Sequence, residues 1–249
     1  WGDTDLIPEG LGTYGSRSLQ LGGAAVHETA IKLVEQAKAF AASQLEAAES
    51  DIVLDKERGV FHVAGTPAKS TSWGDLASSR ANDGGLAYAH RFTSGGATFP
   101  FGAHVAVVEV DTETGKVTHL RQIACDDAGT VLNPLLLEGQ IHGGIAQGSA
   151  QALLEEFVYD VDGNPKTGNL AEYAFISAVE APQIELVAMA TPTPRNPLGA
   201  KGVGESGTIG STPAVQSAVV DAVAHLGVRH IDMPTTSAPI CRRKRYSAR

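Results

Sequence analysis

The chain has 249 residues, a formal net charge of -9, and a composition that is 43% hydrophobic and 19% charged. This length and composition are those of an ordinary globular protein with one large core or two smaller ones. The acidic balance excludes nucleic acid as the main partner, because binding phosphates needs a basic face. The basic run Arg242–Arg245 is expected to be a solvated C-terminal tail.

The number of cysteines and the length of apolar runs indicate the cellular compartment that suits the protein. Cys125 and Cys241 are too few for a disulfide framework, which fits a reducing compartment. No apolar run approaches the ~20 residues of a membrane span. We therefore expect a cytoplasmic protein without a membrane span. Trp1–Gly10 has the character of the middle of a loop, so we also expect a fragment of a longer polypeptide.

The first part of the chain is expected to hold a loop, a long helix and a hairpin. The loop is the glycine-rich stretch Gly10–Ser18. From Gly22 to about Ala48, apolar residues recur every three or four positions, which predicts a helix. Asp51–Leu54 and Gly59–Val63 flank a charged turn and predict a β-hairpin. Ser72–Leu76 is typical of a short capped helix.

The second part alternates strands and helices after a glycine- and serine-rich loop at 81–102. The expected elements are, in order, a hairpin of strands 104–110 and 117–124, a helix from Asn133-Pro134 to about Glu156, a strand at 184–190, a helix that begins at Pro213, and a final strand at 228–233. Because helices interleave with antiparallel pairs, we expect an α/β (α+β) fold in which helices pack on mixed sheets. No domain linker or internal repeat is visible.

The stretch Asn196–Gly210 places one carboxylate, Glu205, among small residues. Its glycines 199, 202, 204 and 207 are expected to permit positive φ angles and close approach of a ligand to the backbone. Glu205 is then either a general base beside a ligand or an acidic residue at a helix N-terminus. The pattern Gly202-x-Gly204-x-x-Gly207 also matches a dinucleotide fingerprint, but a proline-rich loop precedes it instead of a strand, which argues against a Rossmann fold.

Two further patterns leave alternatives open. Glycines recur along the helix that starts at Asn133, at positions 139, 143, 144 and 148, and indicate either tight packing or close approach of a ligand. The pair Asp126-Asp127 is either catalytic or a set of turn caps. The histidines and cysteines show no metal-ligand spacing, so we expect no metal held by protein side chains.

Four blocks, in this order, resemble the C-terminal half of the large subunit of the xanthine oxidase family of molybdenum hydroxylases, with most similarity to the bacterial carbon monoxide dehydrogenase-type chains. The blocks are Gly2-Asp-Thr with Gly12-Thr-Tyr-Gly-Ser-Arg-Ser18, Asp126-Asp-Ala-Gly-Thr-Val-Leu-Asn-Pro134, Glu138-Gly-Gln-Ile-His-Gly-Gly-Ile-Ala-Gln-Gly148, and Gly199-Ala-Lys-Gly-Val-Gly-Glu-Ser-Gly207. The resemblance spans nearly the whole chain, so residues 1–249 would form the C-terminal molybdopterin-binding domain of that subunit.

The resemblance implies a molybdenum–molybdopterin cofactor, in bacteria commonly the cytosine dinucleotide form, whose metal is held by the pterin. It implies that Glu205 is the catalytic base beside the metal. The residues that would contact the cofactor are Tyr14, Gly15, Ser16, Arg17, Asp126, Gln140, Lys201, Gly202 and Gly204.

The implied activity is oxidation or hydroxylation of an aldehyde, an N-heterocycle or carbon monoxide with oxygen from water. Electrons would leave through an iron–sulfur small subunit with [2Fe-2S] clusters and a medium subunit with FAD. The site would lie between this part and the N-terminal half of the large subunit, so the chain is expected to be inactive alone. The alternative is a non-catalytic nucleotide-binding, phosphate-binding or assembly module in which Glu205 only caps a helix.

Overall fold

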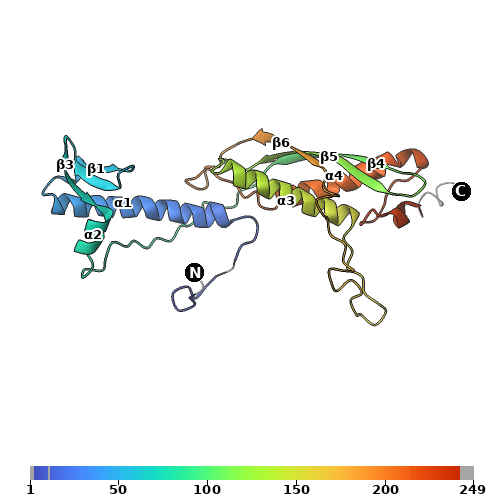
Figure 1. The fold of residues 1–249 in the computed structure, drawn as a ribbon, viewed down its shortest axis with the longest axis horizontal. Helices are drawn as coiled ribbons and strands as arrows, with labels where there is room; N and C mark the ends of the chain where they lie inside the picture. The colour runs from blue at the N-terminus through green and yellow to red at the C-terminus, as the bar shows by residue number, and fades with distance from the viewer. Residues whose placement is uncertain (1–2, 11, 242–249) are drawn as a thin grey trace. The chain divides into compact units, whose positions relative to one another are not determined.

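The computed structural model describes residues 3–10 and 12–241, which form two compact units (Figure 1). One unit is Gln20–Gly95. The other combines the described residues before Gln20 with those after Gly95. The basic run predicted to be a solvated tail lies outside the described residues. Within the described part, no helix is both long enough and apolar enough to span a bilayer.

The Gln20–Gly95 unit is a helix packed on a small antiparallel sheet (Figure 1). Its elements are a π-helical turn at Leu19–Gly23, α1 (Ala24–Gln44), a 3-10 turn at Glu49–Asp51, β1 (Ile52–Asp55), β2 (Val60–Val63), β3 (Thr66–Ser72) and α2 (Trp73–Ser79). The sheet order is β1-β2-β3. Its core gathers Ala37 and Ala41 of α1 with Phe61 and Leu76, all with no exposed area.

Most of this unit follows the sequence prediction. The β1–β2 hairpin is confirmed, and α2 begins with a capping box in which Ser72 and Asp75 bond each other's backbone N–H. Strand β3 was not predicted. Five of its seven residues are exposed, so it lacks the alternation of buried and exposed side chains that marks a strand in sequence.

The larger unit places two helices on one face of a mixed sheet (Figure 1). Its elements are β4 (Gly102–Val110), β5 (Val117–Asp127), α3 (Pro134–Leu153), β6 (Gln183–Met189), α4 (Ser206–Ala222) and a 3-10 turn at Ala224–Leu226. The sheet order is β4-β5-β6, with β4 antiparallel and β6 parallel to β5. Ala124 of β5 packs with Ile141 and Ile145 of α3 in the core. The predicted α/β class is therefore correct.

Two predictions about the C-terminal part are wrong. Helix α4 begins at Ser206 and contains Pro213, which was expected to be its start. Proline inside a helix costs about 3 kcal/mol, and the first turns of α4 offset this by packing against α3. The segment 228–233 forms no strand; Val228 and Ile231 instead fill the core beside Val219 and Val223 of α4.

The glycines of α3 divide into two groups. A Cβ on Gly144 would lie 3.1 Å from the Cα of Gly207, and one on Gly148 would lie 2.0 Å from the Ser211 Oγ. These two glycines let α3 and α4 pack closely. A Cβ on Gly139 or Gly143 would meet nothing within 4 Å. The packing explanation therefore holds for the first group only, and the second borders open space.

Candidate functional site

Three distant segments of the larger unit meet at the N-terminus of α4. Glu205 occupies the N-cap position of α4. The Ser16 hydroxyl donates to the Glu205 Oε2 at 2.7 Å and accepts from the Glu205 backbone N–H at 3.0 Å. From α3, the Gln140 Nε2 donates to the carbonyl oxygen of Gly204 at 2.7 Å. The glycine-rich loop, α3 and the segment before α4 are thus joined around one carboxylate.

The Glu205 side chain does not cap the helix, because it makes no hydrogen bond to the first turn of α4. The carboxylate is exposed and bonded to a different segment. The alternative in which Glu205 serves only as a helix cap therefore lacks its defining contact. The glycines before it also differ from expectation. Of the four, only Gly199 has a left-handed backbone (φ 67°), while Gly204 and Gly207 give room for close neighbours.

A cavity of about 390 Å³ opens beside this meeting point. Its walls come from the glycine-rich loop, the segment after β5, the start of α3 and the segment before α4. The lining residues are Thr13, Ser16, Ser18, Leu19, Ala128, Thr130, Val131, Leu132, Asn133, Leu136, Leu137, Gln140, Lys201, Val203 and Gly204. Four predicted site residues are among them: Ser16, Gln140, Lys201 and Gly204.

Lys201 is part of a buried ion pair at the inner wall. Its ammonium donates to the Asp127 Oδ2 at 2.7 Å and to the Thr191 Oγ1 at 2.6 Å. Asp127 also accepts from the Thr191 hydroxyl and from the backbone N–H groups of Thr191 and Gly129. Burial alone would raise the pKa of Asp127, but the hydrogen bonds from Lys201 and Thr191 outweigh it and hold that pKa well below its ordinary value. Asp127 is thus structural.

Asp126 belongs to a different buried network, outside the cavity lining. The His104 Nε2 lies 3.1 and 3.3 Å from the two oxygens of the Asp126 carboxylate. The Gln122 Nε2 lies 3.4 Å from the His104 Nδ1, and the Gln122 Oε1 lies 3.1 Å from the His119 Nε2. Burial lowers the pKa of His119 more than its hydrogen bonds to Gln122 and the Arg121 backbone raise it. Cofactor contact by Asp126 remains a prediction.

The rest of the glycine-rich loop is organised by contacts within itself. The Arg17 guanidinium stacks 3.7 Å from the centre of the Tyr14 ring and donates to the Gly12 carbonyl. Tyr14, Gly15 and Arg17 lie in the same loop as Ser16 but do not line the cavity. Gly202 is buried between two lining residues, Lys201 and Val203. Their roles toward a cofactor remain predictions.

Sequence reasoning missed the apolar wall of the cavity and one partner of the ion pair. Val131, Leu132 and Leu136 are exposed on that wall. In the sequence these apolar residues look like ordinary core residues. Only the structure shows that their side chains are exposed. Thr191 lies 64 residues from Asp127, and only its place after a strand parallel to β5 could have indicated the contact.

The residues present fit a bound cofactor. The Ser206 Oγ, one residue after Glu205, is buried and has no hydrogen-bond partner among the described residues. Gly143 lies one turn after Gln140 on α3 and has open space where a Cβ would project. In residues 3–10 and 12–241, no three His, Cys, Asp or Glu side chains are grouped to hold a metal ion.

A glycine-bordered cavity beside a helix N-terminus is typical of a site for an anionic ligand or cofactor. Residues 1–182 match the family model described as molybdopterin cofactor-binding domain. The chain is 43% identical over 242 residues to the carbon monoxide dehydrogenase large chain of Hydrogenophaga pseudoflava, covering 95% of this chain and 30% of that protein. It is 37% identical over 247 residues to 6-hydroxypseudooxynicotine dehydrogenase complex subunit gamma of Paenarthrobacter nicotinovorans, covering 96% and 31%.

Solved structures agree with these matches. A crystal structure of the Cu,Mo-CO dehydrogenase superposes with a TM-score of 0.84 at 37% identity, covering 99% of this chain and 32% of that one. Quinoline 2-oxidoreductase from Pseudomonas putida 86 gives 0.81 at 36% identity, covering 95% and 31%. The chain belongs to the molybdopterin cofactor-binding domain family of the molybdenum hydroxylase large subunits. The family predicted from the four sequence blocks is thereby confirmed. The chain spans about 30% of the length of these relatives.

Proposed function

We propose that this chain is the C-terminal molybdopterin-binding part of the large subunit of a molybdenum hydroxylase, with Glu205 as its catalytic base. The carrying observation is the position of Glu205. Its carboxylate is exposed and bonded to Ser16, a residue that lines the cavity, and its backbone is fixed by contacts from two other segments. A general base needs this combination of access and fixed geometry.

The residues around the cavity have separate tasks in this proposal. A bound molybdopterin supplies the redox centre that accepts electrons from the substrate. Backbone groups of the glycine-rich loop and of the segment before α4, with Gln140, hold the cofactor. The Asp127–Lys201 pair keeps the inner wall rigid. Glu205 takes the proton from the water-derived oxygen that is added to the substrate. Val131, Leu132 and Leu136 exclude water from one side.

The finer features are proposed from the family resemblance of the sequence. The cofactor is proposed to be the cytosine dinucleotide form, and electrons are proposed to pass to [2Fe-2S] and FAD subunits in the cytoplasm. The remaining large-subunit polypeptide, including its N-terminal half, completes the site. The substrate is proposed to be an aldehyde, an N-heterocycle or carbon monoxide, because the similar proteins include a nicotine 6-hydroxylase, a carbon monoxide dehydrogenase and a quinoline oxidoreductase.

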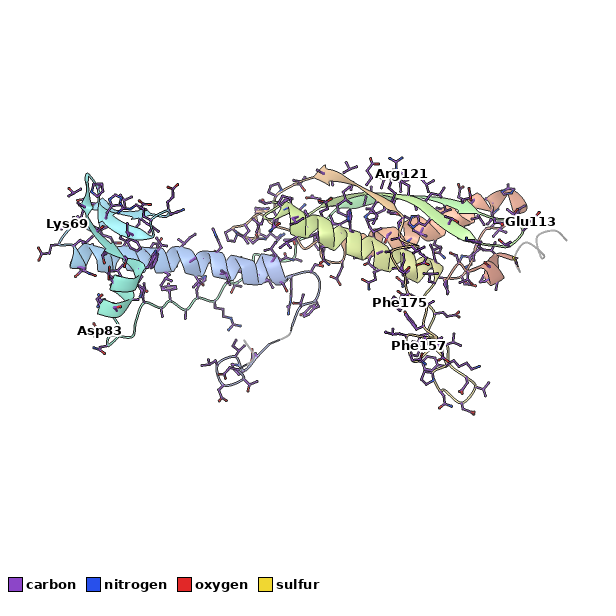
Figure 2. The ribbon with its side chains drawn as sticks, in the orientation of Figure 1. Lys69, Asp83, Glu113, Arg121, Phe157 and Phe175 are labelled. Carbon is purple, nitrogen blue, oxygen red and sulfur yellow. The ribbon has the colours of Figure 1, made fainter. Side chains whose placement is uncertain are left out.

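The test is Glu205→Gln in the complete enzyme that contains this chain. Glutamine preserves size and the hydrogen bond with Ser16 but cannot take the proton, so turnover should fall by about 100-fold or more. Molybdenum content, measured by mass spectrometry, should stay unchanged, and denaturation should release cytidine monophosphate after hydrolysis. Glu113→Gln, in the β4–β5 turn (Figure 2), is the matched control and should keep full activity. Full turnover in Glu205→Gln would exclude the proposed base.

A further inference from the structure

We propose that Ser16 positions the Glu205 carboxylate for proton transfer. This role rests on the proposed function of Glu205 and differs from the cofactor contact expected for Ser16. The two residues are 189 positions apart in sequence, so their contact depends on the folded arrangement of the larger unit. Ser16 does not react; it acts through Glu205.

The Ser16 hydroxyl holds Glu205 at two points. It donates to the Oε2 of the carboxylate at 2.7 Å, and it accepts from the backbone N–H of the same residue at 3.0 Å. A bond to the backbone alone would leave the side chain free to rotate. A bond to the carboxylate alone would leave the chain segment free to shift. One hydroxyl restricts both movements.

The peptide group between Gly204 and Glu205 is held at both of its ends. Its carbonyl oxygen accepts from the Gln140 Nε2 at 2.7 Å, and its N–H donates to Ser16. Because a peptide group is planar, two partners at opposite ends fix its rotation. The side chain of Glu205 therefore leaves a backbone of set orientation, and the Ser16 hydroxyl then fixes the far end of that side chain.

The backbone of Ser16 is adapted to this contact. Its φ is 52°, in the left-handed region that non-glycine residues rarely occupy. Such a conformation is strained and persists where the surroundings impose it. The neighbour Gly204 also leaves room, because a Cβ there would lie 3.1 Å from the Ser16 Oγ. The left-handed backbone of Ser16 and the absence of a side chain at Gly204 thus let the hydroxyl reach Glu205.

Three variants of Ser16 in the complete enzyme separate the hydroxyl from the backbone. Ser16→Ala removes the hydroxyl, and Ser16→Gly removes it while relaxing the left-handed backbone. Both should lower kcat by on the order of 10- to 100-fold, because a small misplacement of a catalytic group costs that much. KM and molybdenum content should not change. Ser16→Asn, which tolerates a left-handed backbone and supplies an amide donor, should recover part of kcat.

The matched control is Ser177→Ala, which removes another serine hydroxyl that donates to a glutamate, Glu180, outside the cavity. It should leave kcat unchanged. The coupling is measured by adding Ser16→Ala to Glu205→Gln, where the residual rate should fall no further if Ser16 acts through Glu205.

Each possible failure has a distinct meaning. Full kcat in Ser16→Ala, with Glu205→Gln inactive, would overturn the positioning role and leave the proposed function standing. Loss of molybdenum from Ser16→Ala would also overturn it, because Ser16 would then be a cofactor ligand. If Ser16→Gly keeps full kcat while Ser16→Ala loses it, the loss in Ser16→Ala would come from backbone strain, and the positioning role of the hydroxyl would be overturned. An active Glu205→Gln would overturn the function itself.

Discussion

At the scale of single residues, the ion pair between Asp127 and Lys201 joins two buried charges inside the larger unit. The Asp127 side chain has no exposed area and accepts four hydrogen bonds from Lys201, Thr191 and Gly129. Removing one partner of such a pair strands a buried charge, which typically costs about 3–5 kcal/mol. The pair therefore ties the end of β5 to the segment that carries Glu205.

Asp127→Asn should lower the free energy of unfolding by about 3–5 kcal/mol at pH 7. The pH dependence follows from the depressed pKa of Asp127. Its stabilising effect is present above the unfolded-state pKa, near 4, and is lost as the pH falls toward the lower folded-state pKa. Urea unfolding at pH 7 and at pH 3 measures both effects, and the difference between wild type and variant should shrink at pH 3. Asp162→Asn, on an exposed turn, is the control, and an equal loss there would refute the assignment.

At the scale of elements, the contact between α3 and α4 depends on glycines that face the other helix. The Thr208 hydroxyl of α4 donates to the Gly144 carbonyl, and the Thr212 hydroxyl donates to the Gly148 carbonyl. These bonds require the two backbones to lie close together. The contact places the first turns of α4, and thus Glu205, against α3.

Gly148→Ala and Gly143→Ala form a matched pair on one helix. The Cβ at position 148 would lie 2.9 Å from the Thr208 carbonyl oxygen, so overpacking should destabilise the protein by about 1–3 kcal/mol. Position 143 is open, and alanine there should keep or raise stability by up to about 1 kcal/mol through its helix propensity. Urea midpoints provide the comparison. Similar losses in both variants would contradict the packing explanation.

Sequence reasoning succeeded where local signals agree with the fold. Asn133 caps α3 as its position before Pro134 predicted, and the β4–β5 hairpin has its expected turn. It failed where tertiary packing decides. Pro213 favours a helix start, but packing against α3 extends α4 seven residues earlier, to Ser206. The apolar residues at 228–233 led to the prediction of a strand. Hydrophobicity alone does not reveal whether a partner strand exists for them to pair with.

For the site, too, the sequence predicts which residues belong together but not how they contact one another. The family motifs predicted that Ser16, Gln140, Lys201, Gly204 and Glu205 belong together, and the structure brings all five to one region. No spacing could show that Ser16 contacts Glu205 directly, or that Asp126 faces His104. Those contacts are set by how separate segments meet in three dimensions.

At the scale of the larger unit, the face of the sheet opposite α3 and α4 carries exposed apolar side chains and is uncovered within the described residues. Val105 and Val107 of β4 are 55% and 42% exposed, and Val187 of β6 is 48% exposed. Their strand neighbours Ile123 and Cys125 share that face. Arg121, paired with Glu185, marks it in Figure 2. Exposed Phe157 and Phe175 lie on the segment between α3 and β6.

Because exposed apolar patches mark interaction surfaces, we propose that this sheet face packs against the rest of the large subunit to which the proposed function assigns the chain. Val107→Lys should leave thermal stability of the chain itself nearly unchanged, since residue 107 contacts solvent. It should reduce co-purification of the chain with the remaining polypeptide when the two are expressed as separate chains. Val53→Lys, on β1 of the other unit and equally exposed at 42%, is the control. Undiminished co-purification of Val107→Lys would show that this face is not an interface.

The network that begins at Asp126 has a fixed direction. An amide nitrogen only donates, so the His104 Nδ1 accepts from the Gln122 amide and the His104 Nε2–H donates to the Asp126 carboxylate. An amide oxygen only accepts, so the His119 Nε2 donates to Gln122. The Gln122 amide thus sets the tautomer of both imidazoles, because its nitrogen donates to His104 and its oxygen accepts from His119. An ionised carboxylate only accepts, so Asp126 fixes the direction of every hydrogen bond along this line.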